Sequence, residues 1–200
     1  MIEKPSEKDD IYLANVAKIG NSAENIIYIE NVLHKDKHKE ILDFVTHRKF
    51  WVQQPWDAKT IGLDQMSDEV IDSLEEVFTV AYEKAKDVYD VPIDIFSKDR
   101  FNLIKFEKDF VLHPHADVNS NESLHIASIY YINDEYEGGE ISLIDHNIKI
   151  KPKPNSLIIF PGNENYTHEV FRILEGERYS SSLWFQFTGS NFNKNKEWYD

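Results

Sequence analysis

The sequence predicts a mainly β fold, a β-sandwich or barrel with supporting α-helices packed on it. The second half of the chain holds seven short segments rich in Ile, Tyr, Phe and Ser that are separated by turn residues, a pattern typical of sandwiches and barrels. The first half holds two segments in which apolar residues recur at helical spacing. Because no repeat, low-complexity segment or linker composition separates the halves, we expect one domain over residues 1–200.

The composition narrows the classes of function. The chain has 200 residues, of which 41% are hydrophobic, and this is enough to bury the core of one globular domain. Its formal net charge of −14 repels a phosphate backbone, so we expect no nucleic-acid partner. It has no cysteine, which leaves His, Asp and Glu as possible metal ligands. No segment resembles a signal peptide or a span of about 18 apolar residues, so we expect a soluble, cytoplasmic protein without a membrane partner.

The chain is expected to begin with a loose, polar tail over residues 1–10. Two segments with strand character follow at residues 11–19 and 25–30, and the turn-prone residues 20–22 separate them. Together with the helices described next, they form a supporting region that we place at residues 11–100.

The first predicted helix covers residues 35–49. Three apolar residues fall on one side of it, namely Ile41, Leu42 and Val45. Three histidines are assigned to its polar surface, namely His34, His38 and His47. Trp51 and Trp56 then flank a proline-containing loop, where we expect them to pack against the protein.

The second predicted helix begins at the N-cap Ser67 and ends near Tyr89. Its apolar stripe, which we expect to lie against a sheet, comprises Ile71, Leu74, Phe78, Ala81, Tyr82 and Ala85. The seven predicted strands cover residues 101–110, 124–133, 140–144, 147–151, 156–160, 168–173 and 178–187. They define a β core over residues 101–188, which a C-terminal tail over residues 189–200 follows.

The short stretch His115-Ala116-Asp117 is the first candidate for chemistry. Residues two apart on an extended chain point to the same side, so His115 and Asp117 can bind one metal ion together. The third ligand is assigned to His168, which lies farther along the chain. Two imidazoles and one carboxylate on one face of a metal form the arrangement of non-haem Fe(II) oxygenases, which leaves open positions for substrate and oxygen.

An iron site of this kind needs a co-substrate, and 2-oxoglutarate would need a fixed cation for its distal carboxylate. The fork of an arginine suits that role, and Arg178 begins the last predicted strand. Alternation places Ser180 and Trp184 on the same face as Arg178. We expect Ser180 to add a hydroxyl donor and Trp184 to form an apolar wall of the co-substrate pocket.

Other histidines are weaker candidates. His113 shares the predicted face of His115 and Asp117, so it is an alternative metal ligand. The pattern favours a different role, in which His113 contacts a metal ligand or the substrate. Isolated histidines are more often surface residues or hydrogen-bonded core residues than ligands. We therefore assign no chemistry to His34, His38, His47, His125 and His146.

The chain from His115 to Phe187 resembles the Fe(II)/2-oxoglutarate dioxygenases, and among them the prolyl 4-hydroxylase-like branch. Six motifs carry this resemblance in order: HAD at 115–117, SIYYIND at 128–134, GGE at 138–140, SLIIFPG at 156–162, HEV at 168–170, and GERYS at 176–180 leading into LWF at 183–185. The helices before them look like the supporting helices of that family.

The resemblance implies a double-stranded β-helix, also called a jelly roll or cupin-like fold, with iron near one mouth of the barrel. It implies that His115, Asp117 and His168 hold Fe(II) and that Arg178 pairs with the distal carboxylate. It also matches Tyr131 to a tyrosine that bonds the same carboxylate, and Trp184 to a tryptophan of the iron pocket. No further catalytic side chain is assigned. The implied cofactors are Fe(II), 2-oxoglutarate as co-substrate and O₂, with ascorbate as reductant.

Two positions distinguish this chain from many members of that branch. Phe106 stands where many members carry a tyrosine that contacts the co-substrate, and either Asn102 or Lys105 is a candidate to compensate for the lost hydroxyl. Many members also have lysine at the position of Arg178, so arginine places the chain nearer the oxygen-sensing and bacterial members than the collagen type.

The leading hypothesis is a hydroxylase that acts on prolyl residues of a peptide or protein and converts 2-oxoglutarate to succinate and CO₂. The same chemistry on another amino acid, a small metabolite or an alkylated base is the alternative within enzymes. A cupin-like module that binds metal and ligand without turnover is the alternative from another class. Substrate choice is expected to depend on loops at residues 51–63 and 118–123, and the sequence predicts no oligomeric state.

Overall fold

The computed structural model describes residues 21–89, 96–98, 101–117 and 125–187. The predicted tail at 1–10, the predicted strand at 11–19, the loop at 118–123 and the C-terminal tail at 189–200 lie outside the described residues. Within the described part of the chain, no helix is long and apolar enough to cross a membrane.

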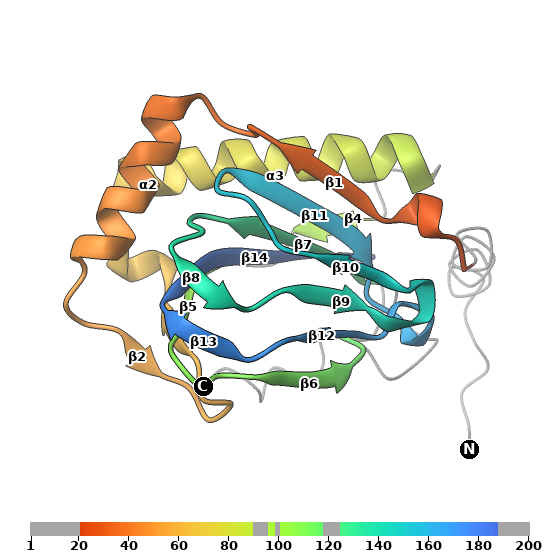
Figure 1. Cartoon of the computed structure of the whole chain (residues 1–200). Coiled ribbons are helices and arrows are strands. Elements are labelled where there is room, and N and C mark those ends of the chain that lie inside the picture. Colours follow the sequence, from red (N-terminus) through yellow and green to blue (C-terminus); the bar gives the residue numbers. More distant parts are fainter. Residues whose placement is uncertain (1–20, 90–95, 99–100, 118–124, 188–200) are drawn as a thin grey trace, which may run out of the picture.

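Two long helices lie on one side of the molecule (Figure 1). Helix α2 covers Lys35–His47 and α3 covers Asp68–Tyr89, so both end close to the predicted positions. Of its predicted stripe, helix α3 buries Leu74, Phe78, Ala81 and Ala85, while Ile71 and Tyr82 are half-buried. The helix also buries Val70, Ser73, Val77 and Tyr89. Three-residue 3₁₀ turns occur at Ala23–Asn25, Leu63–Gln65, Ile144–His146 and Glu164–Tyr166.

The major sheet is antiparallel and has the strand order β1-β11-β7-β14-β5-β3-β2, with β4 paired to β14 beside this path. Its strands are β1 (Ile27–Glu30), β2 (Val52–Gln53), β3 (Lys59–Ile61), β4 (Phe96–Lys98), β5 (Asn102–Phe106), β7 (His125–Tyr131), β11 (Ser156–Pro161) and β14 (Arg178–Phe187). Strand β14 lies between β7 and β5, so its side chains reach the centre of both faces of the sheet.

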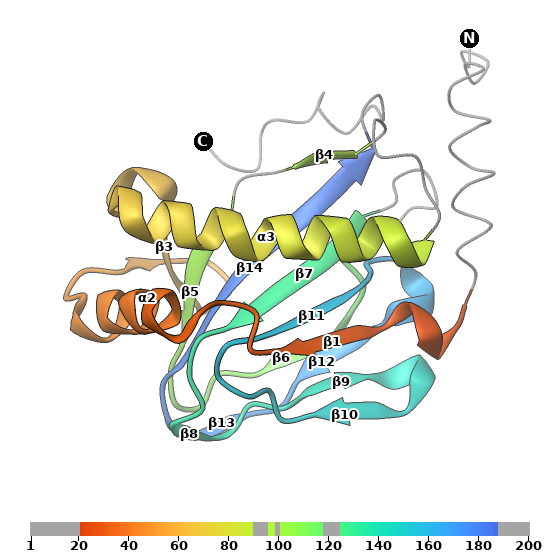
Figure 2. The same ribbon diagram turned by 90° about the horizontal axis from the view of Figure 1, so that it is seen from above.

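The minor sheet is antiparallel and has the order β10-β9-β12-β6, and a separate pair joins β13 to β8. These strands are β6 (Leu112–His115), β8 (Tyr136–Gly138), β9 (Ile141–Leu143), β10 (Ile148–Ile150), β12 (His168–Val170) and β13 (Ile173–Gly176). Figure 2 shows α3, the major sheet and the minor sheet as successive layers. The two sheets facing each other form the predicted double-stranded β-helix, packed against the two helices.

The described residues form three hydrophobic clusters, of which one contains Phe106 and Tyr136 and the other two fill the spaces between these layers. Of these two, the first packs helix residues such as Leu74 and Phe78 against the outer face of the major sheet, where Leu183 and Phe185 lie. The second lies between the sheets and joins Tyr131 and Phe160 to residues of β9. The alternation predicted for β14 is confirmed, because Tyr179, Leu183 and Phe185 pack with the helices while Ser180 and Ser182 lie opposite Tyr131 and Ile129.

Several predicted boundaries were wrong. The segment predicted as one strand at 101–110 contains β5 alone, and a turn then leads to β6. The short strands β2, β3, β8 and β13 were not predicted. They have two to four residues each, which is too short for alternation to distinguish them from loops.

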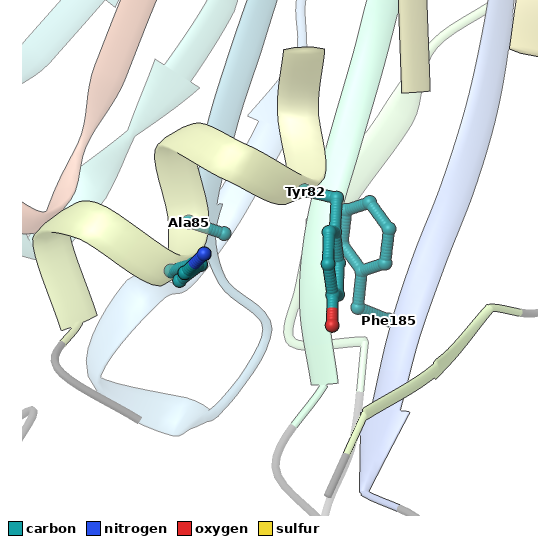
Figure 3. Close-up of a pocket in the computed structure, with 4 residues that line it drawn as sticks. Tyr82, Ala85 and Phe185 are labelled. Atoms are coloured by element: carbon teal, nitrogen blue, oxygen red, sulfur yellow. The ribbon is translucent and has the colours of Figure 1, made fainter. Parts of the chain in front are cut away.

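A shallow hollow under α3 is lined by Tyr82, Ala85, Lys86 and Phe185 (Figure 3). The rings of Tyr82 and Phe185 lie 5.6 Å apart between centroids. This hollow is on the helix side of the major sheet, and it contains none of the predicted site residues.

Candidate active site

The structure brings His115, Asp117 and His168 together. His168 on β12 is the direct cross-strand partner of His115 on β6, and the two rings lie 4.3 Å apart between centroids. Asp117 follows the end of β6, and its Oδ1 lies 3.9 Å from Nε2 of His115 and 3.7 Å from Nε2 of His168. One ligand atom from each residue lies within 4.8 Å of the others, so a single ion between them can contact all three.

Backbone carbonyls orient both imidazoles. Nδ1 of His115 lies 2.8 Å from the carbonyl oxygen of His113, and Nδ1 of His168 lies 3.2 Å from that of Tyr166. A carbonyl can only accept a hydrogen bond, so both Nδ1 atoms carry the proton and donate it. Both Nε2 atoms are then left with lone pairs that face Asp117, the arrangement that a metal ion requires.

His113 takes part through its backbone and not through its side chain. The pairing of β12 with β6 shifts by one residue between Leu112 and His115, which is a β-bulge that breaks the alternation on which the shared face of His113 depended. The His113 side chain is exposed, and it is absent from the described cluster of possible metal ligands. The ligand set built on His113 is therefore wrong, and its carbonyl positions His115 instead.

The electrostatics of this cluster favour a neutral imidazole. Burial lowers the pKa of His168, with the nearby charge of Asp117 opposing the shift and His115 adding to it. Oδ2 of Asp117 is buried and has no hydrogen-bond partner. A buried carboxylate oxygen without a donor is costly, and a bound cation would remove that cost.

Arg178 lies in the interior with only 2% of its surface exposed. Its Nη1 donates a hydrogen bond of 2.9 Å to the carbonyl oxygen of Gly139, while its Nε has no partner. The guanidinium carbon lies 4.8 Å from the ring centroid of Phe106 and 5.1 Å from that of Tyr131. Within the described part of the chain no ion pair joins Arg178 to an acidic side chain, so the cation is buried without a counter-charge.

Two tyrosine hydroxyls face the same region without hydrogen-bond partners. They belong to Tyr131, whose side chain is fully buried, and Tyr136 on β8, which is 6% exposed. Burial raises the pKa of Tyr136 to about 12 and also raises that of Tyr131, and the positive charge of Arg178 opposes both shifts. Both phenols are therefore protonated donors. Tyr136 was missed from the sequence, where its segment was assigned to the turn between two strands.

Ser180 and Trp184 lie on the predicted face of β14. Ser180 is buried directly opposite Tyr131, and Trp184 is opposite Ala127. Trp184 is half-buried and packs against the core that contains Phe160, whose ring meets that of His168 edge-on at 4.8 Å. Both side chains are placed where they could line a co-substrate pocket between the histidines and Arg178. Their contacts with a co-substrate stay predictions.

Of the two candidates to replace the hydroxyl that Phe106 lacks, Lys105 lies on the wrong face and Asn102 on the right one. Phe106 pairs with Arg178 across the strands and stacks on Phe110 at 3.9 Å, so it supports the guanidinium from one side. Lys105 lies on the opposite face, where Nζ is 2.8 Å from Glu107 and 3.1 Å from Glu177. Asn102 does share the face of Arg178, with a buried Oδ1 that accepts no hydrogen bond. The amide nitrogen of the same side chain can donate a hydrogen bond, so Asn102 stays a candidate.

The remaining described histidines have structural surroundings. His38 was assigned to the surface, but it is half-buried, and its Nδ1 lies 2.8 Å from the hydroxyl of Tyr130. His146 stacks on Tyr166 at 4.7 Å. His34 and His47 are exposed, as predicted, and the side chain of His125 lies outside the described residues.

The buried polar atoms without partners fit the two missing groups. Among the described residues such atoms occur on Asn102, Asp117, Tyr131, Tyr136 and Arg178. Asp117 belongs to the histidine cluster, and the other four belong to the face of the barrel on which Arg178 lies. Buried polar groups are nearly always paired, so a cluster of exceptions indicates an absent ligand. Asp117 and two imidazoles suit a divalent metal, while Arg178 and two phenols suit a carboxylate.

Comparisons with known proteins agree with this chemistry. Residues 101–186 match the family described as the 2OG-Fe(II) oxygenase superfamily. No curated protein matches the sequence.

Solved structures share the fold at low sequence identity. A collagen prolyl hydroxylase of Paramecium bursaria Chlorella virus-1, determined with 2OG, has a TM-score of 0.64 and 14% identity, over 84% of this chain and 99% of the viral one. A Trichoplax adhaerens prolyl hydroxylase bound to a hypoxia inducible factor peptide has a TM-score of 0.66 and 14% identity, over 91% and 93% of the two chains. A Pseudomonas putida prolyl-4-hydroxylase has a TM-score of 0.67 and 12% identity, over 88% and 99%.

Proposed function

We propose that the protein is a hydroxylase whose metal ligands are His115, Asp117 and His168. Residues 101–186 match the model of the 2OG-Fe(II) oxygenase superfamily, and the chain shares its fold with prolyl hydroxylases. Arg178, with the hydroxyl of Tyr131, would bind the distal carboxylate of 2-oxoglutarate. When bound, Fe(II) and 2-oxoglutarate would supply the oxidising chemistry, with the co-substrate converted to succinate and CO₂.

One observation carries this proposal: a buried arginine that has no counter-charge among the described residues lies in the same barrel as a cluster of two imidazoles and a carboxylate. A metal site alone does not need a second, buried cation. A buried charge that nothing in the described residues neutralises is destabilising, so its retention favours an anionic ligand. The side chains would hold the ligand, fix its orientation and exclude water from the interior of the barrel.

The test is succinate production by the purified protein supplied with Fe(II), 2-oxoglutarate, O₂ and ascorbate. We expect succinate from the wild type and its loss in Asp117→Ala and His168→Ala, because each change removes one of three ligands. His113→Ala is the matched control, since its exposed side chain does not join the cluster. It should keep its activity because the carbonyl that orients His115 belongs to the backbone.

Equal succinate from the wild type and the two ligand variants would contradict the proposal. Binding of iron and 2-oxoglutarate with no succinate, even with substrate present, would favour a binding module without turnover. Ascorbate enters only as the expected reductant, and omitting it should lower the number of turnovers.

We further propose that the substrate is a prolyl residue in a peptide or protein. The support is the shared fold with prolyl hydroxylases, two of which are described as a collagen hydroxylase and as a complex with a peptide. Mass spectrometry of proline-containing peptides after reaction should show the gain of one oxygen atom. A gain on free amino acids, small metabolites or alkylated bases in place of these peptides would exclude the prolyl substrate and retain the reaction class.

A further inference from the structure

The hydroxyl of Tyr136 is buried and has no hydrogen-bond partner. The edge of its ring occupies the space where a side chain at Gly139 would lie, because a Cβ placed on that glycine would be 2.9 Å from Cε2 of the tyrosine. The carbonyl oxygen of the same glycine accepts the hydrogen bond from Arg178. Gly139 is therefore a neighbour of both Tyr136 and Arg178. The hydroxyl of Tyr136 and Nε of Arg178 are both donors without an acceptor.

The surroundings of Tyr136 hold its ring in place. Gly139 and Gly176 have φ angles of +67° and +80°, and a Cβ on Gly176 would lie 2.6 Å from the carbonyl oxygen of Glu135. These glycines allow the backbone to close around the tyrosine. On the other side, Nζ of Lys151 lies 3.7 Å from the centroid of the Tyr136 ring.

Lys151 is anchored where it meets the ring. Its Nζ donates hydrogen bonds of 3.0 Å and 2.6 Å to the carbonyl oxygens of Tyr136 and Gly138. A cation over a phenol ring is attracted by the ring face. Lys151 thus packs on one face of the Tyr136 ring and binds the backbone carbonyls of β8. We therefore call Lys151 a positioning residue for Tyr136.

We propose that Tyr136 is a third donor to the distal carboxylate of 2-oxoglutarate, acting beside Arg178 and Tyr131. This inference rests on the function proposed above. A carboxylate offers about four lone-pair positions, and Arg178 already donates one of its N–H groups to the carbonyl oxygen of Gly139. The hydroxyls of Tyr131 and Tyr136 would donate to the lone-pair positions of the carboxylate that Arg178 does not reach. Tyr136 would also supply, from a different strand, the hydroxyl that is missing at Phe106.

The experiment measures binding by calorimetry without oxygen, with Mn(II) in place of Fe(II) so that no turnover occurs. Two probes are compared: 2-oxoglutarate, and 2-oxopentanoate, which has the same carbon chain without the distal carboxylate. We expect Tyr136→Phe to weaken 2-oxoglutarate binding roughly 10- to 100-fold, the factor for one hydrogen bond to a charged group. Binding of 2-oxopentanoate should not change.

Tyr89→Phe is the matched control. It removes the hydroxyl of another buried tyrosine, which donates 2.7 Å to the carbonyl oxygen of Asn25 on the helix side, and it should leave both affinities unchanged. Arg178→Met should weaken 2-oxoglutarate binding more than Tyr136→Phe does.

The outcomes separate this inference from the function on which it rests. If Tyr136→Phe binds 2-oxoglutarate as the wild type does, or weakens both probes equally, the third donor is excluded while the function stands. If the wild type does not prefer 2-oxoglutarate over 2-oxopentanoate, both fail.

Discussion

Two single residues, Arg178 and Asp117, have buried polar atoms without hydrogen-bond partners, and such atoms indicate a ligand-binding site. Arg178 is a buried cation for which the described residues provide one carbonyl and two aromatic rings but no carboxylate. Asp117 is a nearly buried carboxylate with one unpaired oxygen. Each alone is costly in water-free surroundings. Their opposite charges do not neutralise each other by an ion pair among the described residues, so each is free to take a ligand.

The half-buried His38 predicts a pH dependence of stability. Burial lowers its pKa from the ordinary value of 6.5, with Glu135 opposing the shift. Well above pH 6.5 the ring is neutral in both the folded and the unfolded chain. Below that value the unfolded chain takes up the proton first, so stability falls as the pH drops towards the lowered pKa.

We expect His38→Gln to lose less stability than the wild type when the pH falls below 6.5. Urea unfolding at several pH values measures this difference, and the comparison cancels the contribution of His168, whose pKa burial also lowers. Identical pH profiles for the two proteins would show that His38 does not titrate differently in the folded state.

At the scale of elements, the short β8–β13 pair has a clear role. It places Tyr136 beside Arg178, and it depends on glycines. Gly138 has a φ of +73°, and a Cβ there would lie 2.0 Å from the carbonyl oxygen of Arg172. Because that oxygen belongs to the backbone directly before strand β13, the clash cannot be relieved by a side-chain rotation.

We therefore expect Gly138→Ala to lower the free energy of unfolding by about 3 kcal/mol and to weaken 2-oxoglutarate binding. Gly62→Ala is the control, because its φ is −83° and the nearest atom, at 3.0 Å, is a side-chain oxygen of Asp64. It should change stability by less than about 1 kcal/mol. Denaturant unfolding of both variants checks the difference, and equal effects would contradict the role assigned to the turn.

Elements differ in how well the sequence predicts them. Strand β14 was predicted with both of its ends, because Arg178 to Phe187 alternates polar and apolar residues over a long run. Helix α3 was predicted from the spacing of residues such as Leu74 and Phe78. Strands β8 and β13 were missed because each has too few residues to alternate. Tyr136 was missed with them, since nothing local marks a turn residue as buried.

The histidine cluster shows the same limit. His115 and Asp117 were found from their spacing, and His168 from a motif. The bulge that turns His113 outwards depends on how β6 pairs with β12. Pairing between strands distant in sequence is a tertiary property, so the local pattern predicted a face for His113 that the folded chain does not have.

In the whole molecule, the core between the helices and the major sheet lies on a different face of that sheet from the candidate active site. Helix α3 lies over one face of the major sheet (Figure 2) and shares a core with it, while Tyr131 of the site belongs to the core on the other face. Leu74 is fully buried in the first core. A change there should affect folding and leave the site intact.

We expect Leu74→Ala to lower the free energy of unfolding by about 3 kcal/mol, through lost burial and the cavity left behind. At a temperature where the variant is folded, its affinity for 2-oxoglutarate should equal that of the wild type. Val88→Ala on the same helix, at a side chain that is 41% exposed, should change neither quantity. A large loss of affinity in Leu74→Ala would show that the two layers are coupled.

A crystal structure of the protein with Mn(II) and 2-oxoglutarate decides whether the barrel holds both groups as proposed. We predict an anomalous-scattering peak between Nε2 of His115, Nε2 of His168 and the carboxylate of Asp117. We also predict that the distal carboxylate of 2-oxoglutarate contacts Arg178 and Tyr131. A metal bound elsewhere, or a co-substrate whose distal carboxylate lies away from Arg178, would contradict the proposed site.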